Sequence, residues 1–88
     1  MLENFKKYLI QKGYSEYTPS GNPSTAYDYV KRINKICERE RISINQLADN
    51  IHNYVKKYDT GGSEEDFGKK SHSAFINALK RFEEFNKN

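Results

Sequence analysis

Apolar side chains recur three and four positions apart along most of this chain of 88 residues, which is the spacing of amphipathic α-helices. The β-branched residues follow the same spacing instead of alternating with polar residues, so strands are hardly indicated anywhere. The pattern predicts an all-α fold, a compact four-helix bundle that forms one domain over residues 1–88. The helices are expected at about 2–12, 23–40, 44–58 and 69–86.

Residues of the kinds that end or begin helices lie between the first segments. Gly13 is placed to end the first helix. Asn22 and Pro23 match an N-cap followed by a first-turn proline, so the second helix is expected to begin there. The segments 14–22 and 59–68 are rich in Gly, Pro and small polar residues, and both are expected to be loops.

The third segment carries two start signals. Ser43 and Gln46 have the spacing of a capping box, and Asp49 offers a second N-terminus. We therefore expect a short turn of helix that leads into a helix ending near Tyr58.

The apolar faces of these helices should form the core, and aromatic rings should supply much of its volume. Hydrophobic residues make up only 35% of the chain, while aromatic residues make up 14%. The positions on the predicted buried faces are Phe5, Tyr8, Leu9, Ala26, Tyr29, Val30, Ile33, Ile36, Cys37, Ile51, Tyr54, Val55, Tyr58, Phe75, Ala78, Leu79, Phe82 and Phe85.

No segment approaches the roughly 20 apolar residues of a membrane span, and the N-terminal segment lacks the pattern of a signal peptide. We expect a cytoplasmic protein that does not associate with membranes. Fifteen Lys and Arg against twelve Asp and Glu give a formal net charge of +3. This total is a weak indication of an anionic partner, and the distribution of the basic residues matters more.

No group of residues predicts catalysis. His52 and His72 belong to no metal-binding pattern, and Cys37 has no second Cys to form a zinc site. The acidic run 64–66 lacks the spacing of a calcium loop, and the glycines at 61–62 lack the Lys-Ser/Thr ending of a phosphate-binding loop. We predict no catalytic residue, no metal site and no cofactor.

Basic residues gather on the outer side of the second predicted helix. With about 100° per residue, Ile33 lies near the middle of the apolar arc, and four cationic residues fall within about 100° of one another on the opposite side. These residues are Lys31, Arg32, Lys35 and Arg39. The stripe is either a surface for an anionic partner or the ordinary charged exterior of an amphipathic helix.

The fourth predicted helix has a similar outer side. Its basic, hydroxyl and amide residues are those that contact phosphate oxygens and base edges of DNA. They are Lys69, Lys70, Ser73, Asn77 and Lys80. Two helices with the same chemistry would support DNA binding if folding brings the two faces together.

The order of elements resembles a known family. The segments "FKKYLIQKG", "STAYDYVKRINKICERERIS", "INQLADNIHNYVKKY" and "KSHSAFINALKRFEEF" are similar to the N-terminal core-binding, or SAM-like, domain of tyrosine recombinases and phage integrases. The markers are the Phe5 to Leu9 start, the helix after a Ser/Thr, the spaced Ile, Leu and Tyr of the third element, and the Ala78-Leu79-x-x-Phe82 ending.

The resemblance implies a helical clamp on double-stranded DNA, in which the second and fourth helices face the major groove and a separate C-terminal domain performs the chemistry. His52 and His72 are followed three residues later by Val55 and Phe75, so the His-x-x-Arg motif of recombinases is not matched. We expect a monomeric DNA-binding chain that does not cleave DNA.

A protein interaction module with the same fold is the alternative. In that case the basic faces would only increase solubility, and exposed apolar residues in the loops would contact the partner. Tyr14, Tyr17 and Phe67 are the candidates for such contacts.

Overall fold

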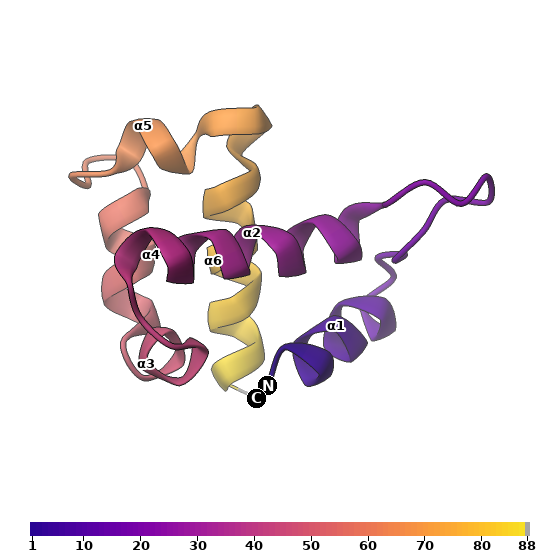
Figure 1. Ribbon diagram of the computed structural model, residues 1–88. Coiled ribbons are helices and arrows are strands. Elements are labelled where there is room, and N and C mark those ends of the chain that lie inside the picture. Colours follow the sequence, from indigo (N-terminus) through magenta and orange to yellow (C-terminus); the bar gives the residue numbers. More distant parts are fainter. Residues whose placement is uncertain (88) are drawn as a thin grey trace.

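The computed structural model describes residues 1–87 and confirms the all-α class (Figure 1). Within these residues there are six helices, so the prediction of four is wrong. They are α1 (Leu2–Gln11), α2 (Thr25–Glu40), α3 (Ile44–Asp49), α4 (Ile51–Tyr58), α5 (Glu65–Gly68) and α6 (Lys70–Lys87). None of the helices in this part of the chain has both the length and the apolar character that crossing a bilayer requires.

The start of α2 differs from the prediction. Ser24, not Asn22, is the N-cap, and the helix begins at Thr25. The residues before it are engaged in a hairpin-like loop, in which the Ser24 N–H donates to the Glu16 carbonyl at 2.8 Å and the Thr18 N–H donates to the Asn22 carbonyl at 2.8 Å. This extended pairing commits Asn22 to the loop, which projects away from the helices in Figure 1.

The third segment forms two short helices. The start signal at Ser43 is confirmed, whereas Asp49 is the last residue of α3 and Asn50 is the N-cap of α4. The Gln46 N–H donates to the Ser43 hydroxyl at 3.1 Å, and the Ser43 N–H donates to the Gln46 side-chain oxygen at 2.8 Å, which completes the capping box of α3. At Asn50 the backbone leaves the helical region, with φ −121° and ψ 24°, and α4 then runs to Tyr58.

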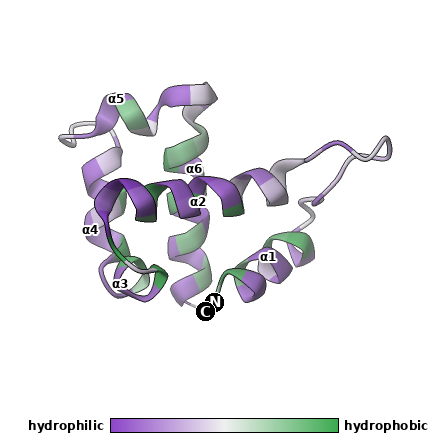
Figure 2. Cartoon of the chain, viewed as in Figure 1, coloured by the Kyte–Doolittle hydropathy of each residue, from purple (hydrophilic) through white to green (hydrophobic). Residues whose placement is uncertain are grey.

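The core lies where α2 crosses α6 and where α1 and α4 also pack against α6 (Figure 1). Apolar residues, green in Figure 2, occur in all of these helices between hydrophilic ones. The Phe5 and Phe82 rings meet edge to face at 5.1 Å. The buried residues are Phe5, Leu9, Ala26, Ile33, Ile36, Leu47, Ile51, Val55, Tyr58, Phe75, Ile76, Ala78, Leu79 and Phe82. All of them except Leu47 and Ile76 were predicted.

The beginning of α6 is not a regular helix. Ser71, His72 and Ser73 have φ of 54°, 59° and 65°, which places three successive residues in the left-handed region. A non-glycine residue there is disfavoured by about 1–2 kcal/mol. The continuous fourth helix predicted from residue 69 is therefore wrong, and the right-handed part of α6 follows this left-handed turn.

The left-handed turn changes which residues meet. In a continuous α-helix, residues 67 and 75 would be separated by about 12 Å along the axis. Here the Phe67 and Phe75 ring centroids are 4.5 Å apart, and Phe67 also contacts Tyr58 at 6.0 Å. The turn thus folds α5 back, so that Phe67 packs at the edge of the core.

Glycine at the left-handed turn should stabilise the protein. His72 is exposed, and replacing it with glycine would remove the penalty on its left-handed backbone. We expect His72→Gly to raise the free energy of unfolding by about 1 kcal/mol, measured by urea unfolding.

The matched control is Asn77→Gly, at an exposed position in the right-handed part of α6. Glycine there should lower stability by about 0.3 kcal/mol, because asparagine is itself a weak helix former. A loss of stability at both positions would mean that residues 71–73 are ordinary right-handed helix.

Candidate cationic surface over an aromatic pair

Two arginines of α2 lie over the Phe67–Phe75 pair. The Arg32 guanidinium carbon is 4.8 Å from the centre of the Phe75 ring, and that of Arg39 is 4.1 Å from the centre of the Phe67 ring. A cation near the face of an aromatic ring is attracted by the ring's quadrupole. Because the ring restrains the flat guanidinium, its N–H groups remain available around the edge.

A third cation comes from the start of α6. The Lys70 Nζ atom lies 5.2 Å from the centre of the Phe67 ring, and the side chain is exposed. Residues from two helices therefore converge at one aromatic pair. We call Arg32, Arg39 and Lys70 the cationic surface.

Carboxylates pair with both arginines. Arg32 Nε lies 3.3 Å from Asp28 Oδ1, one helical turn earlier. Arg39 Nη2 donates to Glu64 Oε1 at 2.9 Å, which links α2 to the segment before α5. Each of these contacts uses one nitrogen, and a guanidinium has five N–H donors, so both arginines retain donors for a further anion.

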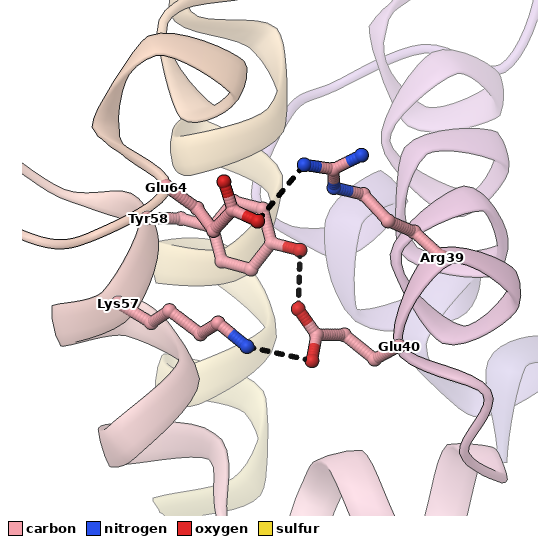
Figure 3. Close-up of polar contacts among 5 residues, drawn as sticks. All are labelled: Arg39, Glu40, Lys57, Tyr58 and Glu64. Atoms are coloured by element: carbon pink, nitrogen blue, oxygen red, sulfur yellow. Dashed lines mark hydrogen bonds and ion pairs between the residues drawn. The ribbon is translucent and has the colours of Figure 1, made fainter.

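A polar network joins the end of α2 to the end of α4, next to Arg39 (Figure 3). The Tyr58 hydroxyl donates to Glu40 Oε2 at 2.5 Å, and Lys57 Nζ donates to Glu40 Oε1 at 2.9 Å. Burial, followed by the nearby Glu40 carboxylate, raises the pKa of Tyr58 far above its usual range, so the hydroxyl stays protonated and remains a donor.

Glu40 is the acceptor at the centre of this network. Burial alone would raise the pKa of its carboxyl, but the hydrogen bonds from Tyr58 and Lys57 and the charges of Lys57 and Arg39 outweigh that effect. The pKa of Glu40 is therefore lowered from its ordinary value of 4.5. The ionised carboxylate holds the C-terminal end of α2, which carries Arg39, against α4.

Three other residues of the fourth segment that were predicted to bind DNA are not part of the cationic surface. Lys69 pairs with Glu65 at 2.6 Å, and Lys80 pairs with Asp59 at 3.4 Å. Ser73 lies in the left-handed turn, where its N–H donates to the Lys69 carbonyl at 3.0 Å.

The outer sides of the two long helices diverge. Because α2 and α6 pack against each other through their buried faces, the sides opposite those faces point away from one another. Asn77 is exposed on the outer side of α6, whereas Lys31 and Lys35 are exposed on the outer side of α2. Lys35 lies 3.8 Å from Glu38. The structure thus brings together Arg32, Arg39 and Lys70, and it does not bring together the two complete predicted faces.

Sequence reasoning missed the aromatic support of this surface. Phe67 was expected in a loop and Phe75 only in the core, and no residue spacing indicates that the two rings touch. The resemblance to integrases placed arginines and lysines near DNA, but it gave no indication of the Glu64 and Glu40 contacts.

Comparisons with known proteins add no relative: no protein-family model, curated protein or solved structure matches this chain. The resemblance to integrase core-binding domains therefore stays a prediction. Among residues 1–87, no three His, Cys, Asp or Glu side chains are grouped so that they could hold a metal ion.

Removing the Tyr58 hydroxyl should destabilise the fold. Tyr58→Phe leaves the ring in the core but takes away the hydrogen bond to a charged acceptor, so we expect a loss of about 2 kcal/mol in the free energy of unfolding. The control is Tyr54→Phe on the same helix, at a half-buried tyrosine for which no hydrogen bond is found within residues 1–87. Equal effects of the two changes would contradict a role for the Tyr58–Glu40 bond.

The contribution of Glu40 should depend on pH. Since folding lowers the pKa of Glu40, its stabilising effect is fully present above pH 4.5 and is lost as the pH falls through the lowered pKa. Wild type should therefore exceed Glu40→Gln in stability at about pH 6, and the difference should shrink at about pH 3. Urea unfolding at both values measures this difference, and a gap that does not change with pH would exclude an ionised Glu40 as its source.

Proposed function

We propose that this chain binds double-stranded DNA through the cationic surface and catalyses no reaction itself. The observation that carries the proposal is the convergence of Arg32, Arg39 and Lys70, from two helices, over the Phe67–Phe75 pair. Cations held near one another at fixed positions suit a phosphate backbone, whose charges recur at regular intervals.

The ion pairs of this surface are compatible with DNA binding. Exposed pairs between side chains typically contribute only about 0–1 kcal/mol, so exchanging a carboxylate for a phosphate costs little. Both arginines also keep N–H donors that Asp28 and Glu64 do not occupy. Phosphate contacts in addition release counterions from DNA, which drives association at low salt.

The resemblance to core-binding domains of tyrosine recombinases supports the same function. In that family this domain holds duplex DNA, and the chemistry belongs to a separate C-terminal domain. For this chain we accordingly propose a DNA-holding role, with a catalytic domain or another protein as the partner that acts on the DNA. Lys69 and Lys80 pair with Glu65 and Asp59, and within residues 1–87 neither lies over an aromatic ring, so they are not included in the proposed surface.

Binding should be weak and should depend on salt. Nonspecific contacts of this kind give dissociation constants of about 10–100 μM at physiological salt. With three phosphate contacts, the logarithm of the binding constant should fall with the logarithm of the salt concentration with a slope of about −2.7.

Lys70→Gln tests the proposal, because this side chain has no carboxylate partner within residues 1–87 and its removal should leave the fold intact. We expect weaker binding to a labelled duplex in fluorescence anisotropy and a slope reduced in magnitude by about 0.9. The matched control is Lys56→Gln, at an exposed lysine of α4 that lies outside the cationic surface.

Two results would contradict the proposal. The first is that the wild-type chain does not bind the duplex even at low salt. The second is that Lys56→Gln changes the slope as much as Lys70→Gln does, which would indicate diffuse attraction by the net charge instead of a defined surface.

A second candidate function is the binding of a protein partner. The Tyr17 and Tyr27 rings support it, because they contact each other in a tilted arrangement, with centroids 5.8 Å apart, while remaining 50% and 39% exposed. Tyrosine is common at protein interfaces, where it supplies a large contact area and a polar hydroxyl. Tyr14 and Phe67, the other predicted contact residues, are instead half-buried, against Tyr29 and Phe75 respectively.

A further inference from the structure

A hollow of about 580 Å³ lies between α1 and α2 and reaches Arg32 of the cationic surface, but Arg39 and Lys70 do not line it. It is bounded by α1 at Leu2, Glu3 and Lys6, by Glu16 in the loop, by α2 from Tyr27 to Glu38 and by Phe75 of α6. That stretch of α2 extends for about 16 Å, which is the length of a peptide helix of three turns or of about five extended residues. The hollow therefore has the dimensions of a groove for a short peptide.

Apolar side chains line part of this hollow. Leu2 of α1 and Val30 of α2 are half-buried there, and both pack against the core. Tyr27 lies at the N-terminal end of the α2 wall and is supported by Tyr17. A site of this kind suits an apolar or aromatic anchor residue, which would cover ring surface that is now exposed.

The charges that line the hollow are paired, with one exception. Lys6 contacts Glu16 at 3.1 Å and Glu3 at 3.7 Å, which neutralises part of the α1 wall. Lys35 pairs with Glu38 and Arg32 with Asp28 on the α2 wall. Within residues 1–87, the remaining charged residue of the lining, Lys31, has no carboxylate partner and is exposed.

We propose that this hollow binds an acidic peptide segment of a protein partner, with an apolar or aromatic anchor on Leu2, Val30 and Tyr27 and a carboxylate on Lys31. The carboxylate would supply the partner that Lys31 lacks, and the contact would be partly shielded from water by the two walls. Arg32 belongs both to the hollow and to the cationic surface, whereas Lys31 lies only in the hollow and Arg39 and Lys70 lie only in the cationic surface.

The test uses the full chain and a labelled peptide of twelve residues that combines Leu and Phe with Asp and Glu. Its counterpart carries Asn and Gln in place of the acids. We expect the acidic peptide to bind in fluorescence anisotropy with a dissociation constant of about 100 μM, and the neutral counterpart to bind about tenfold more weakly. Absence of binding at millimolar concentration, or equal binding of the two peptides, would overturn the proposal.

Two variants locate the site. Lys31→Gln and Tyr27→Ala change exposed side chains, and each should weaken the acidic peptide about five- to tenfold, whereas Lys56→Gln should leave it within about twofold. If the first two variants bind the peptide as wild type does, the peptide binds elsewhere and the proposal fails.

The same variants separate this proposal from DNA binding. Lys31→Gln should leave duplex affinity within about twofold, while Lys70→Gln should weaken it and spare the peptide. Strong loss of duplex binding in Lys31→Gln, together with no peptide binding, would assign the hollow to the DNA surface. Failure of DNA binding with retention of the peptide would refute the proposed function alone.

Discussion

The contact between the Phe67 and Phe75 rings is the interaction on which the candidate surface depends. At 4.5 Å it joins the single turn of α5 to α6, and it requires the left-handed turn at residues 71–73, since a continuous helix would separate the two rings by about 12 Å. The disfavoured backbone of three residues is thus offset by burial of aromatic surface at the edge of the core. The same rings then serve as the support over which the arginines of α2 lie.

The charged residues around this contact have two roles: one stabilises the fold, and the others orient the arginines. Glu40, bound by Tyr58 and Lys57, fixes the end of α2 against α4 and belongs to the fold. Glu64 and Asp28 are more accessible and hold Arg39 and Arg32 through single nitrogens, so that they orient the guanidinium groups without using all their donors. This surface groups three cations even though the net charge of the chain is only +3.

The sequence predicted features that depend on neighbouring residues and missed those that depend on tertiary contacts. The capping box at Ser43 and Gln46 is a local hydrogen-bond pattern, and the apolar spacing around Ile33 correctly placed Lys31 and Lys35 on the exposed side of α2. By contrast, nothing in "KKSHSAF" indicates left-handed residues, because no glycine stands there, and one turn of helix around Phe67 is too short to show a period. The partners of Lys69 and Lys80 likewise depend on how α4, α5 and α6 are placed.

The most direct measurement of the central claim is the NMR spectrum of the arginine side chains. If Arg32 and Arg39 lie over the Phe75 and Phe67 rings, ring currents should shift their side-chain protons upfield in the free protein, and Phe67→Leu should return the Arg39 signals toward ordinary values while leaving those of Arg32 shifted. Addition of a DNA duplex should then move the Nε–H resonances of both arginines. Ordinary shifts for both side chains in the free protein, unaffected by Phe67→Leu and by DNA, would contradict the account of a cationic surface supported by an aromatic pair.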